Sequence, residues 1–353
     1  MAQEITAPTR ALPRVEEKQV KIVSLKRIVF ERFVRHRMAV FGIFVVAFMV
    51  IFAFVGPFIS PYQPDQVNLR ERFAKPSVIM VQGGGGVPHL YNLDAILGIP
   101  GVAANPSADP PTAAKEPIQG FSAERPLKFG HPLGTDDLGR DTMTRAMFGG
   151  RVSLGIGFTV SFLSIIIGAT VGALSGYLGG WWDNIIMRAV DVEHSLPDLP
   201  ILMVMSKIFP PGFATMCLIL TLLAMFRGTR VARAMTLSLK TQLFSEAARS
   251  VGANWSRLIF RHIIPNSLSP LFVSVTLGAG AAIRAETSLS YLGLGIQPPM
   301  PSWGNMLSNA QQYFFSAPWL VFFPGICIFL TLFSFNLIGD GLRDAFDPRM
   351  TRR

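Results

Sequence analysis

The chain has 353 residues, of which 50% are hydrophobic and 15% are charged, and its net charge is +10. An average soluble domain is about 25% charged, and charges are costly in hydrocarbon, so the composition favours one lipid-embedded bundle over two soluble domains. The net charge does not indicate nucleic-acid binding, because the basic residues lie beside apolar runs. Cys217 and Cys327 lie within such runs, so neither a disulfide framework nor a zinc site is expected.

Three uncharged runs reach the length of about 20 residues that a helix needs to cross a bilayer. These runs are 38–59, 152–182 and 316–338. The first run follows a basic segment, 1–37, and no small-residue cleavage site follows it. It is therefore predicted to be an uncleaved first span and not a signal peptide.

Three weaker segments are predicted to complete a bundle of about six transmembrane helices. These segments are 185–209, 212–230 and 267–290. The first contains three acidic residues, the second is short, and the third runs into Arg284 and Glu286. We therefore expect an all-α membrane protein whose core covers 131–341.

The distribution of Lys and Arg predicts the orientation of this bundle. The N-terminal segment 1–37, the loop 231–266 and the tail 342–353 are basic, and a six-span arrangement places all three on one side. Both termini are therefore expected in the cytoplasm.

The segment 60–130 is expected on the opposite side as a loop-rich extracytoplasmic insertion, because it is rich in Pro and Gly and lacks regular periodicity. A spacer is favoured over a binding surface for this insertion. The stretch 134–141, GTDDLGRD, resembles a calcium loop only loosely, because the terminal Glu is missing. It is interpreted as a capped turn that opens a short helix over 142–150.

A glycine at every fourth position marks the second long run. These glycines are Gly168, Gly172, Gly176 and Gly180. Such spacing lines one face of a helix with small residues and lets another backbone approach closely. The alternative is that glycine is simply common in membrane helices, but four in register favour a packing ridge.

The third predicted span contains ionisable residues, which usually face the bundle interior or a solute pathway. We expect Asp198, next to the helix-kinking Pro197, to be a pathway or gate residue. Asp191 and Glu193 lie closer to the cytoplasmic end, where solvation is the alternative. His194 is the single histidine here, and its spacing fits no common zinc motif.

Arg284 and Glu286 stand at the outer end of the fifth predicted span. Because they are two residues apart, they do not face one another on a helix. Each is expected to pair with another helix or to extend toward the membrane surface, and a role in an outer gate is a further interpretation.

The loop between the fourth and fifth spans is predicted to form two short helices with a bend. Gly252 suits a left-handed helix C-terminus, and Asn254 can cap a second helix over 255–262, which Pro265 would end. The bend is then Gly252-Ala253-Asn254. A helix pair lying on the lipid is the alternative, but a basic surface helix usually lacks such a glycine-bounded break. Docking of a soluble partner is therefore favoured.

The sequence contains none of the common catalytic motifs. No G-x-x-x-x-G-K-S/T phosphate loop occurs, so the chain is not expected to bind and hydrolyse ATP by that route. A nucleophile elbow, an H-E-x-x-H motif and a Cys/His cluster are also missing.

The loop resembles the EAA signature of the membrane subunits of ABC importers. The matching positions are Glu246, Ala247, Ala248, Gly252 and Pro265. His262 and Ile264 replace an isoleucine and a leucine of the general signature, and the histidine is a variant associated with the peptide subfamily.

Three further stretches are similar to the C-type permeases of dipeptide and oligopeptide importers. They are HPLGTDDLGRD at 131–141, ETSLSYLGLGIQPPMPSWGNML at 286–307 and FNLIGDGLRDAFDPR at 335–349. The resemblance covers about 25–60 and 130–350. The segment 76–126 is longer than the family pattern, and nothing carries over to it.

The resemblance implies half of a type I importer in the bacterial inner membrane. Such a subunit pairs with a second, homologous permease and two cytoplasmic subunits that bind ATP and Mg²⁺, while an extracytoplasmic binding protein delivers a peptide-like solute. The chain itself would then need no cofactor and would do no covalent chemistry. The residues implied to couple to the ATPase are Glu246, Ala247, Ala248, Gly252, Ala253, Asn254 and Pro265.

Three other functions stay open at the level of sequence. The same machinery could carry nickel, glutathione, a peptide antibiotic or an oligosaccharide. A self-sufficient channel or ion-coupled transporter often has an inverted repeat or paired broken helices, and the sequence shows neither. A membrane anchor for a signalling complex would not need acidic residues and prolines within a span.

Overall fold

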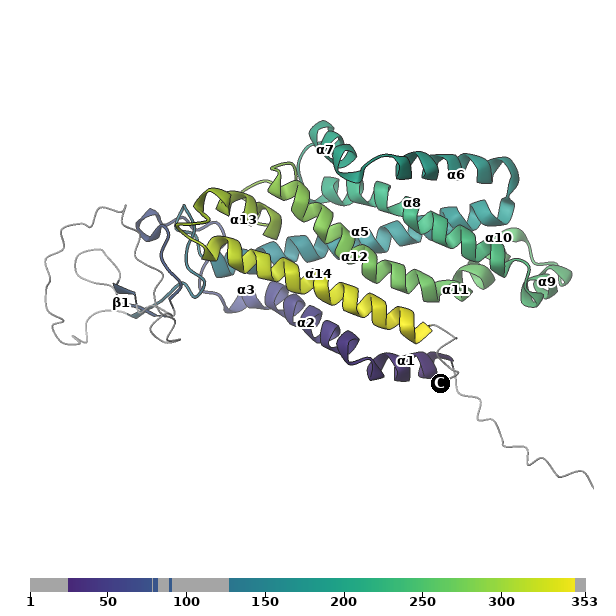
Figure 1. Cartoon of the computed structure of the whole chain (residues 1–353), viewed down its shortest axis with the longest axis horizontal. Coiled ribbons are helices and arrows are strands. Elements are labelled where there is room, and N and C mark those ends of the chain that lie inside the picture. The colour runs from purple at the N-terminus through teal and green to yellow at the C-terminus, as the bar shows by residue number, and fades with distance from the viewer. Residues whose placement is uncertain (1–24, 78, 82–88, 91–126, 347–353) are drawn as a thin grey trace, which may run out of the picture.

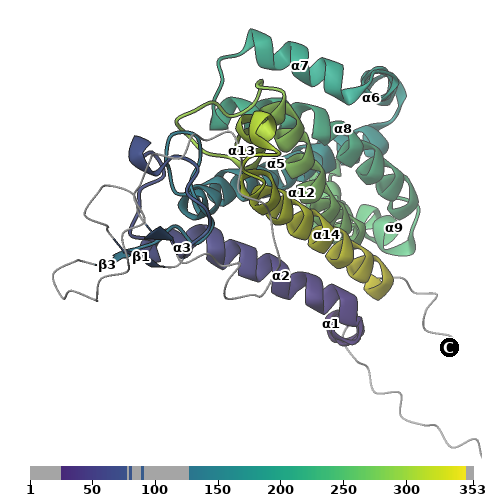
Figure 2. The same cartoon turned by 60° about the vertical axis from the view of Figure 1, so that its left-hand side comes forward.

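The computed structural model describes residues 25–77, 79–81, 89–90 and 127–346. Most of the expected N-terminal segment, most of the insertion and the last seven residues lie outside the described part. The described part is an elongated bundle of helices with a small sheet at one end (Figure 1). Figure 2 shows that α6 and α7 lie along one side of the bundle and α1 and α2 along the other.

The described elements run in chain order from α1 to α14. In order they are α1 (Leu25–Arg35), α2 (Arg37–Phe54), α3 (Gly56–Ile59), η1 (Leu69–Glu71), β1 (Ile79–Val81), β2 (His89–Leu90), β3 (Leu127–Phe129), α5 (Thr142–Leu178), α6 (Gly180–Ser195), α7 (Asp198–Ile208), α8 (Phe213–Leu239), α9 (Leu243–Ser250), α10 (Trp255–Leu258), the π-helix η2 (Ile259–Ile263), α11 (Ile264–Asn266), α12 (Leu268–Tyr291), α13 (Trp303–Ala310), η3 (Gln311–Tyr313) and α14 (Trp319–Phe346).

Five helices in the described part are long and apolar enough to cross a membrane: α2, α5, α8, α12 and α14. The short helix expected over 142–150 is the first part of α5, and the Asp141 carboxylate caps its start by accepting from the Thr144 N–H at 2.7 Å. At 1.5 Å per residue α5 is about 55 Å long, well beyond the roughly 30 Å of hydrocarbon. The helix therefore extends past the membrane at one or both ends.

The segment 185–209 is two helices in the structure where one span is expected. The break falls at Leu196 and Pro197, whose backbones are both extended. Proline lacks an N–H and disfavours helical geometry in the residue before it, so α6 ends there and a new helix begins. Neither α6 nor α7 alone reaches the length of a membrane span.

The ridge of glycines in α5 contacts α8 directly. A Cβ built on Gly168 would lie 2.6 Å from the Met225 carbonyl oxygen, and one on Gly172 would collide with the carbonyl of Thr229. Gly176 continues the ridge against α8. The expectation for Gly180 is corrected: it follows the end of α5, has a φ of +60°, and a Cβ there would meet nothing within 4 Å.

The other long helices enclose a buried core beside the α5–α8 pair. Its members come from α2, α5, α12, α13 and α14, and they are Val45, Met49, Ala53, Leu154, Ala279, Ile283, Trp303, Cys327, Ile328 and Phe335. The Trp303 indole N–H donates to the Ala146 carbonyl at 2.9 Å, which satisfies the polar atom of this buried ring. This bond fixes α13 on α5 at the end of the bundle that also holds the small sheet.

The small sheet has the order β2-β1-β3, with both pairings antiparallel. Met80 is the register partner of Leu90 in β2 and of Lys128 in β3. We call this end of the bundle the insertion end and the opposite end, which carries α9 and α10, the hairpin end (Figure 1).

Replacing Gly172 tests the contact between α5 and α8. Gly172→Ala is expected to destabilise the fold by about 1–3 kcal/mol, the usual cost of overpacking, because the new Cβ would collide with the Thr229 carbonyl. Gly325→Ala is the matched control, since a Cβ at that position of α14 would meet nothing within 4 Å. Thermal unfolding in detergent measures both. A Gly172→Ala protein as stable as wild type would contradict the close contact.

Candidate functional site

The hairpin end carries two short helices joined by a tight bend, which we call the hairpin (243–263). Gly252 has a φ of +86°, and its N–H donates to the Arg249 carbonyl at 2.8 Å. The Asn254 side chain then accepts from the Arg257 N–H at 3.0 Å and caps α10. The predicted left-handed glycine and the predicted Asn cap are both confirmed, because each depends only on local backbone chemistry.

Beyond the cap, the path of the chain differs from the expectation for 255–262. The α-helix ends at Leu258 and continues as the π-helix η2. Pro265 does not end a helix; it stands in the first turn of α11, where the missing N–H costs no intrahelical bond.

The hairpin is fixed to the ends of α5 and α8. The buried Ser245 hydroxyl donates to the Leu239 carbonyl at 2.7 Å, and Leu258 and Ile263 are buried in a cluster with Leu239. The Arg249 guanidinium lies 5.5 Å from the centre of the Tyr177 ring, which also borders this cluster. Movement of the hairpin is therefore linked to movement of both helices.

The hairpin lies at one end of the described bundle (Figure 1), and its outer surface exposes large apolar side chains. Leu243 is 83% exposed, Val251 88% and Trp255 50%. Exposed apolar groups clustered in this way mark an interaction surface. Of the predicted coupling residues, two are half-buried, Ala248 and Ala253, and the others are exposed: Glu246, Ala247, Gly252, Asn254 and Pro265.

A cavity of about 640 Å³ lies between α5, α7, α8, α12 and α14. Asp198, from the start of α7, lines it together with Arg227 of α8 and Arg284 of α12. The Asp198 carboxylate accepts a hydrogen bond from the Arg227 guanidinium. The structure thus brings two of the predicted pathway residues, Asp198 and Arg284, to one cavity, and Pro197 is the N-cap residue directly before α7.

Ion pairs connect α6 to α8 away from this cavity. Asp183 accepts from Arg233 at 2.6 Å, and Asp191 accepts from Arg230 at 3.1 Å. Asp191 is exposed, as the solvation alternative expects, whereas Glu193 is buried. Sequence reasoning did not identify Arg227, Arg230 and Arg233 as the partners of these acids. Their spacing of three residues along α8 places them on one face of that helix.

Glu286 does not line the cavity, although it is on the same helix as Arg284. Its carboxylate is fully buried and accepts from the hydroxyls of Ser153 at 3.0 Å and Ser290 at 2.8 Å. Arg284 lines the cavity from the same helix, because residues two apart on a helix point about 200° apart around its axis. Glu286 therefore holds α12 against α5.

The insertion end contains a buried histidine that sequence reasoning missed. His131 Nδ1 lies 2.8 Å from an Asp141 carboxylate oxygen, and Nε2 lies 3.1 Å from Glu71. The Tyr62 ring packs against the imidazole at a tilt of 31°, with ring centres 4.5 Å apart. Burial lowers the pKa of His131, but the two carboxylates outweigh burial and raise it above 6.5. Burial and the same acids raise the pKa of Tyr62 to about 12. The charged imidazole therefore joins the start of α5 to the segment after α3.

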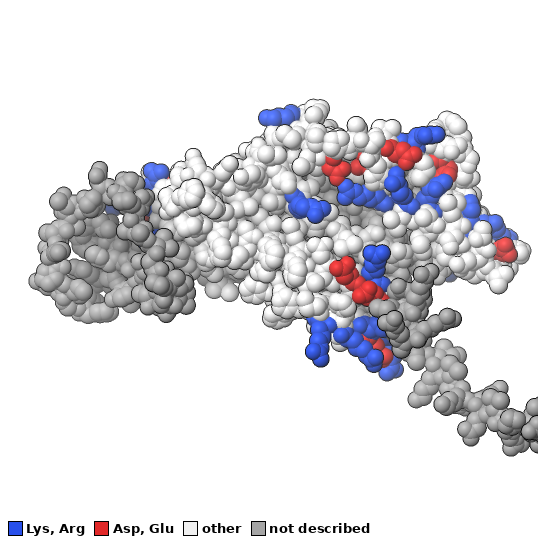
Figure 3. Space-filling view, viewed as in Figure 1, with Lys and Arg blue, Asp and Glu red and all other residues white. Residues whose placement is uncertain are grey.

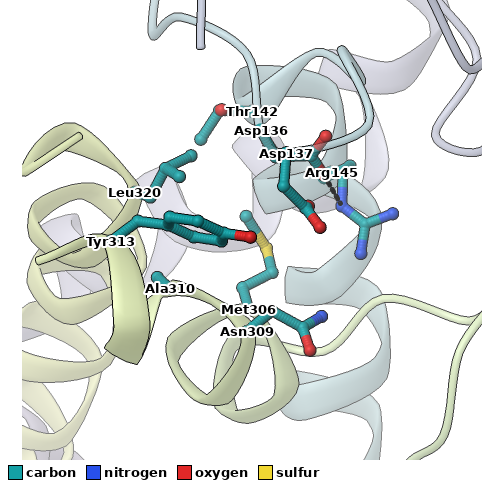
Figure 4. A pocket seen from close by; sticks show the side chains of 9 residues that line it. All are labelled: Asp136, Asp137, Thr142, Arg145, Met306, Asn309, Ala310, Tyr313 and Leu320. Carbon is teal, nitrogen blue, oxygen red and sulfur yellow. Dashed lines mark ion pairs between the residues drawn. The ribbon is translucent and has the colours of Figure 1, made fainter. Parts of the chain in front are cut away.

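A second, much smaller cavity lies between the start of α5, α13 and the start of α14 (Figure 4). Its volume is about 20 Å³, which is room for a single water molecule. In Figure 4 the Arg145 guanidinium faces Asp136, and its Nε lies 3.6 Å from that carboxylate. This space is too small for a solute, so the larger cavity is the candidate pathway. Within the described residues, no group of three or more His, Cys, Asp or Glu side chains could hold a metal ion.

Known protein families match most of this chain. Residues 168–352 match the model of the binding-protein-dependent transport system inner membrane component, and residues 24–76 match the N-terminal TM domain of oligopeptide transport permease C. The chain belongs to the family of binding-protein-dependent transport system inner membrane components. The predicted all-α permease bundle and the resemblance to ABC importer permeases are thereby confirmed.

Several named permease proteins are similar to this chain. The chain is 42% identical to the dipeptide transport system permease protein DppC of Alkalihalophilus pseudofirmus over 233 residues, 66% of this chain and 75% of the relative. It is 32% identical to the DppC of Bacillus subtilis over 324 residues, 92% of this chain and 85% of the relative. It is 43% identical to the glutathione transport system permease protein GsiD of Pectobacterium atrosepticum over 220 residues, 62% and 73% of the two chains.

The buried His131 predicts a pH dependence of stability. Because its folded-state pKa lies above 6.5, the stabilisation is complete below pH 6.5 and is lost as the pH rises through the folded-state value. The unfolding temperature in detergent should therefore fall as the pH is raised from 6.5, and His131→Gln should remove this part of the dependence.

His262→Gln is the matched control for this measurement, because no carboxylate contacts His262 within the described part of the chain. It should keep the wild-type pH profile. An identical profile for wild type and His131→Gln would contradict the assigned charge on His131.

Proposed function

We propose that this chain is the permease subunit of an ATP-driven importer of di- and oligopeptides and forms half of the translocation pathway. The observation that carries the proposal is the hairpin, which exposes an apolar surface at one end and is fixed to helices that line the cavity. The cargo is inferred from relatives named for dipeptide, oligopeptide and glutathione transport. Nickel, peptide antibiotics and oligosaccharides are alternative cargoes of the same machinery.

The second half of the pathway is a homologous permease, and two ATP-binding subunits dock on the two hairpins. The partner subunits bind ATP and Mg²⁺, so this chain does no covalent chemistry. An extracytoplasmic binding protein delivers the solute to the insertion end.

The hairpin end is assigned to the cytoplasm, together with both termini. On the visible face in Figure 3, Lys and Arg side chains gather mainly over the half of the molecule that carries α9 and α1. Such a bias marks the cytoplasmic side of membrane proteins. The bundle would then cross the inner membrane with the five long helices and the α6–α7 pair.

Mechanical linkage explains how such a subunit works. Closure of the ATPase pair would displace the hairpin, and its buried contacts with α5 and α8 would carry that displacement to the cavity wall. The cavity would then alternate between access from the cytoplasm and access from outside. The free energy comes from ATP binding and hydrolysis on the partners, and this chain converts it into a shift between two conformations.

Purification and reconstitution test the proposal. A tagged chain from its native membrane should bring a second permease and ATP-binding subunits with it, and the assembly with its binding protein should take up labelled tri-alanine only with ATP. Uptake by this chain alone without ATP would support the channel or ion-coupled alternative and overturn the proposal.

Glu246→Lys should separate assembly from insertion. Glu246 is exposed on α9, and a reversed charge there should abolish ATPase copurification and uptake while the chain still inserts. Glu31→Lys, on the exposed face of α1, is the matched control and should retain both. Normal copurification with Glu246→Lys would remove the hairpin as the docking element.

Asp198→Asn and Asp191→Asn should differ in their effect on uptake. Both acids pair with arginines of α8, but only Asp198 lines the cavity. Asp198→Asn leaves Arg227 unpaired in the pathway and should lower uptake by about tenfold, as expected for loss of a charged hydrogen bond. Asp191→Asn should have less than about a twofold effect, because Asp191 does not line the cavity. Equal effects would assign both acids to the solvated surface.

A further inference from the structure

The charges of the side chains that line the large cavity do not sum to zero. Asp198 and Arg227 neutralise one another through their ion pair. Arg284 is exposed to the cavity from α12 and has no hydrogen-bond or ion-pair partner within the described part of the chain. Glu286 cannot compensate it, because that carboxylate is buried against Ser153 and Ser290. This half of the pathway therefore carries one uncompensated positive charge.

Apart from Ser288, the uncharged polar side chains around Arg284 already donate to backbone carbonyls. The hydroxyls of Ser161, Ser164 and Ser274 donate to backbone carbonyls, and the Asn336 amide donates to the Leu332 carbonyl at 3.0 Å. Most of the remaining wall is apolar, with leucine, valine, isoleucine and alanine side chains. The Arg284 guanidinium is therefore the strongest unused hydrogen-bond donor on this wall.

An unpaired arginine within a membrane bundle is expensive and usually marks a place where an anion binds or passes. A guanidinium binds a carboxylate through two parallel hydrogen bonds, which a single ammonium group cannot reproduce. Every peptide with a free C-terminus carries such a carboxylate.

We propose that Arg284 is a specificity-determining residue that binds the C-terminal carboxylate of the solute as it crosses the cavity. This inference rests on the proposed function, because it assumes that a peptide passes between this wall and the second permease. It predicts that the pathway itself, and not the binding protein alone, discriminates against peptides without a free carboxylate.

Uptake by the reconstituted assembly tests the inference with labelled tri-alanine and tri-alanine amide. Arg284→Gln should lower uptake of tri-alanine about tenfold, the factor expected for a hydrogen bond to a charged group, and change uptake of the amide less than twofold. Arg284→Lys should retain part of the tri-alanine uptake. Arg188→Gln removes the same charge from the exposed face of α6, outside this cavity, and should match wild type.

Chemical rescue supplies a readout that does not depend on the amide. Arg284→Cys should lose tri-alanine uptake, and 2-aminoethyl methanethiosulfonate, which attaches an ammonium group to the thiol with release of methanesulfinate, should restore part of it. Methyl methanethiosulfonate attaches an uncharged group and should restore none. The two native cysteines are buried and free, so the same reagents on the wild-type assembly are the control.

Three results would overturn the inference. They are equal losses of both peptides in Arg284→Gln, equal rescue by the charged and uncharged reagents, and loss of the second permease from the Arg284→Gln assembly. The last result would show that Arg284 pairs with an acid of the partner. A wild-type assembly that takes up no tri-alanine with ATP would instead contradict the proposed function itself.

Discussion

The contact between α5 and α8 is the interaction on which the rest of the structure depends. Lipid tails are as apolar as leucine, so membrane helices associate through close packing and polar contacts, not through exclusion of water. Gly168, Gly172 and Gly176 let α5 approach the α8 backbone along three turns. The same two helices supply much of the cavity wall and hold the hairpin through Tyr177 and Leu239. Packing at this glycine ridge therefore sets the geometry of both the cavity and the hairpin.

The α6–α7 segment is attached in a different way. Only Val190, Glu193 and Leu202 are buried in it, and Asp183, Asp191 and Asp198 hold it to α8 through ion pairs. The pairs of Asp191 and Asp198 are exposed and contribute little to stability, because solvent and side-chain entropy offset the attraction, whereas the pair of Asp183 is more buried. The break at Pro197 also divides the segment. The α6–α7 segment is consequently the part of the bundle near the cavity whose rearrangement costs the least free energy, while the α5–α8 pair keeps its shape.

Local chemistry decided which parts of the fold could be predicted from the sequence. Gly252 and Asn254 act within one turn of their own backbone, and the glycine ridge follows from helix periodicity, so each could be predicted. Pro197 also acts on its own backbone, but the sequence predicts only a kink of the third span there and not the full break into α6 and α7, and it does not predict the place of Pro265 within the first turn of α11. The different surroundings of Arg284 and Glu286, and the burial of His131 between Asp141 and Glu71, require contacts between segments far apart in the sequence.

The central claim is that the hairpin and the cavity wall on α5 move as one body. Spin labels attached at Phe260 of the hairpin and Phe162 of α5, both exposed, would measure this directly in the assembled transporter by pulsed dipolar spectroscopy. The account predicts one narrow distance distribution that is the same without nucleotide and with ATP. A distribution that broadens or shifts on ATP binding would show that the hairpin moves independently of α5, and would contradict the account.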